Sequence, residues 1–327
     1  MKICIVGSSG HYGYVLNGLD KDSYIAGIAP GPENMDMDSL YKAVEAKGFS
    51  PKRFSDFRDM FDAIKPDIAV AACYFGNNDK VSIEALRRGI NVFTEKPVST
   101  TFEGLELLKK EYKKSNVCFV AMFGIRYSPW FLTAHKAVED GAVGSVRLLN
   151  AQKSYKLGLR NEGYKKRSTY GGTIPWVGSH AIDWVRWFSG EKFESVYASH
   201  STMYNNNYGD LELTALCHFT MSNEVFASVS IDYLRPGSAD THGDDRIRVV
   251  GTKGIVEVMH NRAYLLSDNA GGYRELELMP EGSIFKDFLK EVRGEGKCMV
   301  SAEDSLYITE ACLKARQSAD EKRVVYF

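Results

Sequence analysis

The segment "INVFTEKPVSTT", residues 90–101, places two opposite charges and a proline directly after a short apolar strand. In an open parallel sheet, ligands bind beyond the carboxyl ends of the strands. The ammonium group of Lys96 could there contact a nicotinamide ribose and a substrate oxygen, while Pro97 fixes the direction of the chain. A surface ion pair between Glu95 and Lys96 explains the same residues equally well, so this motif alone leaves both interpretations open.

A glycine-rich turn follows the first apolar strand of the chain. Residues 7–13 read "GSSGHYG". Gly7, Gly10 and Gly13 allow a tight turn and a close approach of the backbone to a pyrophosphate, and the helix that follows offers free N–H groups. A plain strand-to-helix turn also favours glycine. The repeated strand and helix patterns after the loop favour nucleotide binding.

The end of the second strand usually decides between NAD and NADP. A carboxylate there accepts a hydrogen bond from the ribose 2′-OH, whereas an arginine accommodates a 2′-phosphate. Here the strand ends in Ala29, Pro30 and Gly31, followed by Pro32 and Glu33, with no arginine or lysine nearby. The cofactor is therefore expected to be NAD or NADP, and Glu33 favours NAD.

Alternating strand and helix patterns occupy the first 122 residues. Apolar runs such as "KICIVG" and "DIAVAAC" are separated by amphipathic segments such as "NDKVSIEALRRG". Continuous apolar strands between such helices indicate a parallel sheet covered on both faces. Residues 1–122 are therefore predicted to form a dinucleotide-binding Rossmann domain with a doubly wound parallel sheet, so the fold class is α/β.

Longer strands with alternating polar and apolar residues follow from residue 123. They include "SVRLLNAQKSYK" and "VFASVSIDYL", and the helical segment "GSHAIDWVRWFSG" interrupts them. Such alternation indicates a sheet with one face on a core and the other on water, helices or another subunit. Residues 123–327 are predicted to form a substrate-binding α+β domain with a mostly antiparallel open sheet. Its exposed face favours a homodimer or homotetramer, and the last helix could pack back on the first domain.

The composition argues against several classes of protein. A formal net charge of -1 over 327 residues gives no overall attraction to nucleic acid or to an anionic membrane. No apolar run reaches the roughly 18 to 20 residues of a membrane helix, and the chain opens on a strand, so no secretory signal is expected. The six cysteines are scattered without a C-x-x-C pair, which indicates free thiols in a reducing cytoplasm and no metal site.

Several motifs, taken in order, resemble one family. The glycine loop, "ALRRGINVFTEKP", "GIRYSP", "YGGTIPWVGSHAIDW" and "IRVVGTKGIVEV" are together similar to the Gfo/Idh/MocA family of NAD(P)-dependent sugar and polyol oxidoreductases. The likeness covers essentially the whole chain, and E-K-P followed about eighty residues later by G-x-H-x-x-D is a specific pair. The resemblance implies hydride transfer between nicotinamide C4 and a secondary alcohol or carbonyl of a sugar, polyol or sugar acid. It also implies that the open sheet often makes the oligomer contact.

The resemblance assigns roles to individual side chains. Lys96 is expected to hydrogen-bond the reacting oxygen and to orient the nicotinamide. His180 matches the catalytic histidine of the family, and an imidazole can take or give the hydroxyl proton as hydride moves. Asp183, one helical turn further on, could orient that ring or contact the substrate. A satisfied residue at a helix N-terminus is the plainer interpretation of His180.

Further residues are expected to line the two binding sites. The cofactor is expected to contact Gly7, Ser9, Gly10, His11, Tyr12, Gly13, Cys73, Tyr74, Asn78, Glu95, Lys96 and Pro97. The substrate is expected to contact Arg126, Lys156, Arg160, Trp176 and His180. Lys156 and Arg160 belong to a cationic loop, which would suit a carboxylate or phosphate unless it is simply a solvated basic loop. His242 is interpreted as a histidine of a surface loop.

Two positions depart from the family pattern. Many relatives carry an aspartate four residues before the histidine, where this chain has Trp176. An indole cannot accept a proton, although it can stack on a sugar face. Relatives also often have a histidine where this chain has Asn78. Two other functions therefore stay open: a non-catalytic sensor or accessory subunit that binds dinucleotide and sugar, and an enzyme of transient oxidation such as an epimerase or eliminase.

Overall fold

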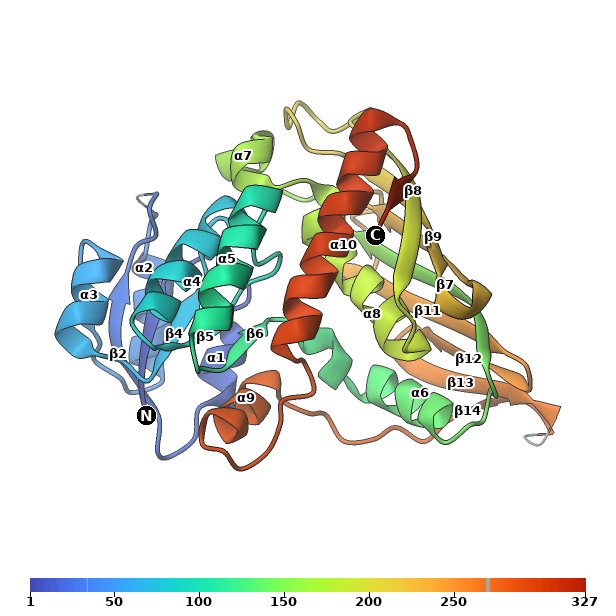
Figure 1. The fold of residues 1–327 in the computed structure, drawn as a ribbon, viewed down its shortest axis with the longest axis horizontal. Helices are drawn as coiled ribbons and strands as arrows, with labels where there is room; N and C mark the ends of the chain where they lie inside the picture. The colour runs from blue at the N-terminus through green and yellow to red at the C-terminus, as the bar shows by residue number, and fades with distance from the viewer. Residues whose placement is uncertain (34, 269–270) are drawn as a thin grey trace. The chain divides into compact units, whose positions relative to one another are not determined.

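The chain divides into two units in the computed structural model, which describes residues 1–33, 35–268 and 271–327 (Figure 1). The first unit consists of Met1–Gly124, Ser168–Gly171 and Ser283–Glu310. The second consists of Ile125–Arg167, Gly172–Gly282 and Ala311–Phe327. Compared with the expected division into 1–122 and 123–327, the first unit thus includes two later segments, one of which ends inside the last helix.

A parallel six-stranded sheet forms the centre of the first unit, in the order β3-β2-β1-β4-β5-β6. All residues of β4 and β6 are buried, as are four of the five in β1. Because successive side chains of a strand point to opposite faces, this burial shows that both faces are covered. The predicted Rossmann sheet is confirmed. Its strands are β1 (Lys2–Val6), β2 (Tyr24–Ala29), β3 (Lys52–Arg53), β4 (Ile68–Ala71), β5 (Asn91–Thr94) and β6 (Phe119–Ala121).

Side-chain hydrogen bonds cap the start of several helices of this unit. The side chain of Asp56 accepts from the N–H of Arg58 at the start of α3, and Thr101 accepts from the N–H of Gly104 at the start of α5. Sequence analysis did not predict α9, whose Phe285 ring packs 5.1 Å from the Phe93 ring of β5. The helices are α1 (Gly13–Gly18), α2 (Asp38–Ala46), α3 (Phe57–Ile64), α4 (Asn78–Arg87), α5 (Phe102–Lys114) and α9 (Ile284–Val292), with the short turns η1 (Phe75–Asn77) and α7 (Arg167–Tyr170).

A nine-stranded sheet forms the second unit, in the order β14-β13-β12-β11-β7-β10-β9-β8-β15. The β7 and β10 strands pair in parallel, and the other neighbours are antiparallel. The predicted mostly antiparallel sheet is confirmed. Its strands are β7 (Val146–Tyr155), β8 (Phe193–Ser201), β9 (Thr214–Met221), β10 (Val225–Asp232), β11 (Gly243–Gly251), β12 (Gly254–Met259), β13 (Arg262–Ser267), β14 (Gly272–Glu275) and β15 (Val325–Tyr326).

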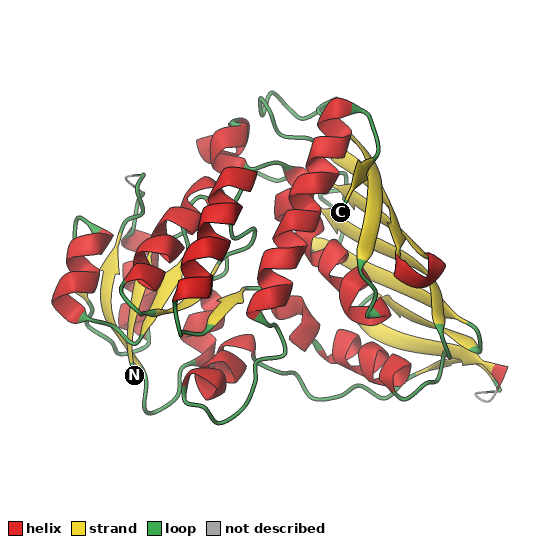
Figure 2. Ribbon diagram, in the orientation of Figure 1, coloured by secondary structure: helices red, strands yellow, loops and turns green. Residues whose placement is uncertain are grey.

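Helices of the described chain pack on one face of this second sheet (Figure 2). They are α6 (Pro129–Glu139), α8 (Ser179–Ser189) and the part of α10 (Ala302–Glu321) that belongs to the second unit. Burial alternates along β10, where Ala227 and Val229 are buried and Phe226 is 43% exposed.

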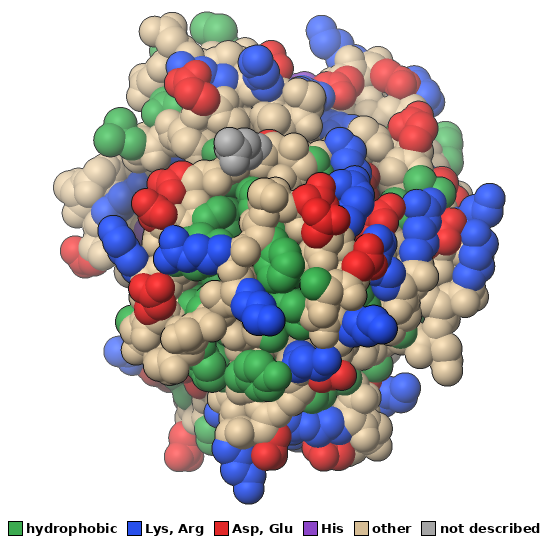
Figure 3. Space-filling view, turned by 90° about the vertical axis from the view of Figure 1, so that its left-hand side faces the viewer, with side chains coloured by type: hydrophobic (Ala, Val, Ile, Leu, Met, Phe, Trp, Pro, Cys, Tyr) green, Lys and Arg blue, Asp and Glu red, His purple; other side chains and the backbone are tan. Residues whose placement is uncertain are grey.

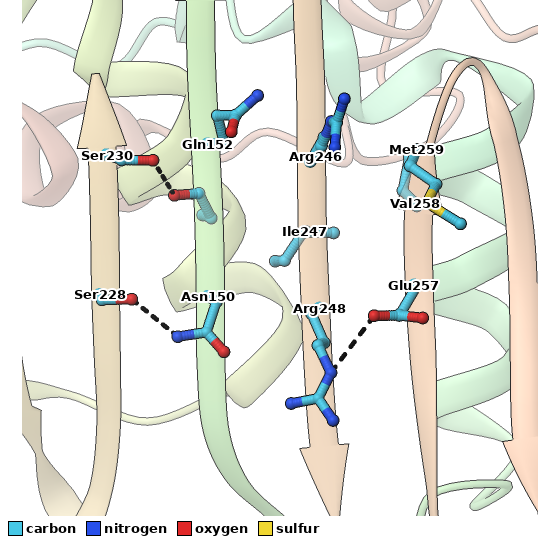
Figure 4. Close-up of a pocket in the computed structure, with 11 residues that line it drawn as sticks. Asn150, Gln152, Ser228, Ser230, Arg246, Ile247, Arg248, Glu257, Val258 and Met259 are labelled. Atoms are coloured by element: carbon cyan, nitrogen blue, oxygen red, sulfur yellow. Dashed lines mark hydrogen bonds and ion pairs between the residues drawn. The ribbon is translucent and has the colours of Figure 1, made fainter. Parts of the chain in front are cut away.

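The face turned away from these helices, called the outer face below, holds a shallow hollow across β10, β7, β11 and β12. Figure 4 shows its polar lining, including Asn150 hydrogen-bonded to Ser228 and Arg248 paired with Glu257.

Charged side chains of both signs are interspersed on the face of the molecule seen in Figure 3. This mixture agrees with the formal net charge of -1, and this face carries no one-signed field that would attract a polyanion. Over the described residues, no helix combines the length and the apolar character required to cross a bilayer.

Candidate active site

The glycine turn of the first unit requires glycine at two positions. Gly7 has φ +84°, and a Cβ there would lie 2.3 Å from the carbonyl oxygen of Ala72. Gly10 has φ +75°. Both values lie in the left-handed region that side chains disfavour. The N–H of Ser9 donates to the Ala72 carbonyl at 2.8 Å, so the turn lies against the carboxyl end of β4.

Gly13, the first residue of α1, has no such requirement. A Cβ at this position would meet no atom within 4 Å, and its φ is not in the left-handed region. Glycine costs roughly 1 kcal/mol relative to alanine inside a helix, so the fold alone gives no reason for it. The open space beside its backbone fits a pyrophosphate that approaches the chain closely, and the turn therefore fits a dinucleotide.

Glu95 holds this turn through hydrogen bonds of its carboxylate. Its side chain is completely buried, and its Oε1 accepts from the N–H of His11 and lies 2.5 Å from His11 Nδ1. Its Oε2 accepts from the N–H of Lys96 at 2.9 Å. Burial raises the pKa of Glu95, but His11 and Lys96 outweigh it and hold the pKa below its ordinary value of 4.5. An ionised carboxylate thus joins the glycine turn to the E-K-P motif, and these contacts make Glu95 and His11 supports of the loop.

Asn78 makes a second connection at the same strand ends. Its Oδ1 accepts from the N–H of Cys73 at 3.2 Å, and its Nδ2 donates to the carbonyl oxygens of Glu95 and Pro97 at 3.4 and 3.3 Å. The side chain is fully buried. The amide at this position therefore holds the end of β4 against the loop after β5.

Glu33, the carboxylate that favours NAD, lies beside Tyr74. Its Oε1 accepts from the Tyr74 N–H at 2.8 Å, and its Oε2 accepts from the side chain of Asn77. Burial raises the pKa of Glu33, although these hydrogen bonds oppose the shift. Tyr12, also expected at the cofactor, precedes the first residue of α1.

Lys96 lies two residues after β5, at the carboxyl edge where the glycine turn and Asn78 also lie. The side chain is 1% exposed. Lysine is seldom so deeply buried in proteins unless its charge is paired or serves a function. In the first unit the structure thus brings together the E-K-P motif, the glycine turn and Glu33.

The helix that carries His180 in the second unit begins earlier than the segment 178–190 predicts. Ile174–Gly178 (η4) form a π-helical turn that continues into α8. Turns of this kind often mark functional sites. Trp176 lies in the π turn and His180 in the first turn of α8, and their side chains are 7% and 1% exposed. The proline at position 175, which suits the start of a helix, was the signal for the earlier start.

Asp183 and Arg126 bind each other. Nε of Arg126 donates to one carboxylate oxygen of Asp183 at 2.8 Å, and Nη2 donates to the other. Both side chains are almost completely buried, and the guanidinium lies 5.3 Å from the ring centre of Trp187. A buried bidentate pair is well suited to fix α8 against the segment that carries Arg126, because loss of either partner would leave an uncompensated charge. These contacts favour a supporting role for both residues.

Two family models match this chain. The model described as oxidoreductase family, NAD-binding Rossmann fold, matches residues 2–123, and the GFO/IDH/MocA C-terminal domain model matches residues 131–257. The chain belongs to the GFO/IDH/MocA oxidoreductase family. The expected family, an NAD-type cofactor and an oxidoreductase activity are thereby confirmed, and this GFO/IDH/MocA protein is an enzyme.

Individual relatives support the family membership. A solved structure of a Thermotoga maritima protein assigned as an oxidoreductase is 56% identical, with a TM-score of 0.98 and 100% of each chain covered. The myo-inositol 2-dehydrogenase of Thermotoga maritima is 24% identical over 299 residues, which are 88% of this chain and 87% of that protein. The aldose-aldose oxidoreductase of Caulobacter crescentus shares the fold, with 20% identity, a TM-score of 0.83 and coverage of 100% and 99%.

Lys153 is a buried charge of this GFO/IDH/MocA chain that sequence analysis did not single out. Lys153 of β7 points to the helix-covered face, and its Nζ lies 2.5 Å from Asp245 Oδ1 on the neighbouring β11. The ammonium lies 4.7 Å from the ring centre of Tyr155 and 5.5 Å from that of Trp184. Burial lowers the pKa of Lys153, and Asp245 opposes that shift. The signal was a lysine at an inward position of an alternating strand.

Proposed function

We propose that this enzyme transfers a hydride between NAD and a secondary alcohol or carbonyl of a sugar, polyol or sugar acid. The observation that carries the proposal is the buried Lys96 at the carboxyl end of β5, joined through Glu95 to a glycine turn with open space at Gly13. The similarity to a myo-inositol 2-dehydrogenase along most of both chains supports the substrate class. The carboxylate of Glu33 favours NAD, because it would repel a 2′-phosphate.

In this proposal each unit contributes one reacting side chain. NAD, when bound, supplies the acceptor for the hydride. The ammonium of Lys96 donates a hydrogen bond to the substrate oxygen and stabilises the negative charge that develops there. The imidazole of His180 takes the hydroxyl proton during oxidation and returns it during reduction. The indole of Trp176 stacks on a face of the sugar ring, and proton transfer then depends on His180 without help from a carboxylate at position 176.

A panel of sugars, sugar acids and inositols tests the reaction class. With NAD and the true substrate, absorbance at 340 nm is expected to rise with turnover, and NADP is expected to be used more slowly. Product formed without a net change at 340 nm would instead indicate transient oxidation, as in an epimerase or eliminase. Binding of NAD and a sugar with no product would indicate a sensor or accessory subunit. Either of these two results would contradict the proposed dehydrogenase.

We also propose that the protein is a cytoplasmic homodimer or homotetramer that associates through its outer face. Large apolar side chains are exposed on strands of this sheet, including Leu216 at 57% and Phe226 at 43%. The cysteines of the described chain are free, and Cys118 alone among them is not fully buried, which suits a reducing compartment. Sedimentation velocity should give a mass of at least twice the 36.6 kDa of one chain. A monomer at micromolar concentration would contradict the proposed association.

A further inference from the structure

Basic side chains gather near the carboxyl ends of β7 and β10 in the second unit. Lys156 follows β7 directly, Arg160 lies four residues further on, and His242 precedes β11. The rings of Tyr155 and Tyr233, one at the end of each parallel strand, lie 6.3 Å apart. Arg160, Lys156 and His242 are called the cationic cluster below.

Arg160 has no acidic partner among the described residues. Its guanidinium lies 5.1 Å from the ring centre of Tyr233 and 5.5 Å from that of Tyr164. Nη2 donates to the carbonyl oxygen of Lys156 at 3.0 Å, while the buried Nε finds no partner in the described chain. A guanidinium offers five N–H donors, and leaving a buried donor without a hydrogen bond is unfavourable. The tyrosine rings therefore hold an arginine whose charge and donors are available to a ligand.

Lys156 adds a second charge that no described carboxylate neutralises. Its Nζ donates to the carbonyl oxygens of Gly237, at 2.9 Å, and of Ala239. These carbonyls orient the ammonium without cancelling its charge. The N–H of Lys156 donates to the His242 carbonyl at 2.9 Å, which fixes the two segments side by side.

The imidazole of His242 lies in the field of these cations. Its ring centre is 4.9 Å from that of Tyr155. Burial lowers the pKa of His242, and the charges of Arg160, Lys156 and Lys153 lower it further. A local excess of positive charge has this effect on a histidine.

The two carboxylates that follow His242 in β11 are already paired with other cations. Asp245 pairs with Lys153, and Asp244 pairs with Arg235 and Arg246. The charges of Arg160 and Lys156 therefore remain in excess at the carboxyl ends of the two strands. Such a surplus, held by a planar guanidinium between aromatic rings, is the arrangement that recognises carboxylate or phosphate oxygens.

We propose that the cationic cluster binds an anionic group of the substrate, a carboxylate or a phosphate ester, while Tyr155 and Tyr233 contact the sugar carbons. The substrate is then an acidic sugar, and neutral polyols are poor substrates. This inference rests on the proposed function, because it describes the substrate of that same reaction. Arg160 is the residue that decides specificity.

Calorimetric titration of the full chain with saturating NADH tests the anion site. Each series contains one neutral sugar, its uronate and its 6-phosphate. The first series is glucose, glucuronate and glucose 6-phosphate, and the second is the corresponding set for galactose. We expect at least one acidic sugar to bind about tenfold more tightly than its neutral parent, or about 1.4 kcal/mol. Comparing the affinities for the uronate and for the sugar phosphate shows which of the two anions the cationic cluster binds.

Arg160→Gln should remove most of the advantage that the acidic sugar has over its neutral parent. The matched control is Lys165→Gln, which removes the same charge from the same loop, where Lys165 pairs at 2.8 Å with the exposed Glu162. Thermal unfolding of both variants verifies that they are folded. Equal affinities for neutral and acidic sugars, equal losses in the two variants, or no binding of any acidic sugar would overturn the inference.

The binding measurement needs no hydride transfer, so the two proposals can fail separately. If the chain binds an acidic sugar through Arg160 but never reduces NAD, the anion site is supported and the dehydrogenase function is contradicted. A chain that oxidises only neutral polyols would keep the dehydrogenase function and lose the anion site.

Discussion

Replacing Lys96 by alanine is expected to lower kcat by at least ~10²-fold, the usual scale for a group that acts directly on the reacting atoms. The substitution removes a buried ammonium at the carboxyl end of β5 and keeps the backbone N–H of residue 96 that donates to Glu95. Because the lost hydrogen bond strengthens as negative charge develops on the oxygen, kcat should fall more than the affinity for the sugar. Steady-state rates at 340 nm, with NADH binding followed by its fluorescence, measure the two effects.

The matched control for Lys96 is Lys109→Ala. Lys109 belongs to the same unit and pairs with Glu106 and Glu310 in a partly exposed position on α5. Its removal should leave kcat within about twofold, since exposed ion pairs contribute only 0–1 kcal/mol. Full turnover by Lys96→Ala, with NADH still bound, would exclude the lysine from the chemistry.

Replacing His180 by asparagine is expected to lower kcat by a similar factor and to change the shape of the pH profile. If the imidazole is the base in oxidation, kcat/KM of the native enzyme rises with pH as the imidazole loses its proton. The variant has no imidazole at position 180, so the kcat/KM of its remaining activity should lack this rise with pH, called the limb below. Rates from pH 5 to pH 9 measure the difference.

The control for His180 is His218→Asn, which removes an exposed histidine from β9 of the same unit. That variant should keep both the rate and the limb of the profile. A purely structural role of His180 could lower the rate but would leave the limb in place. Persistence of the limb in His180→Asn would therefore assign proton transfer to another group.

Residue patterns predicted the two sheets because burial follows the alternation of side chains. The continuous apolar runs of β1 and β4 are buried on both faces, and the alternating residues of β10 cover a core on one face only. The glycine turn was also predictable, since Gly7 has a conformation that few other residues adopt. These features depend on neighbours within a few positions of the chain.

Pairs that depend on the register of distant strands could not be predicted in this way. Lys153 and Asp245 are direct partners in the β7–β11 ladder although 92 residues separate them. Arg126 and Asp183 meet across 57 residues. A single sequence shows each charge but not its partner, so Asp183 was interpreted as a neighbour of His180 and the carboxylate that neutralises Arg126 was not found.

The hydrogen bonds of the Glu95 carboxylate have a consequence for altering cofactor preference. One carboxylate holds both His11, beside the NAD turn, and the backbone of Lys96. A substitution of this acid would therefore disturb nucleotide capture and alcohol activation together, and the resulting losses would not be additive. Attempts to convert the enzyme to NADP should leave Glu95 untouched and begin at Glu33, whose contacts are with Tyr74 and Asn77 and not with the E-K-P motif.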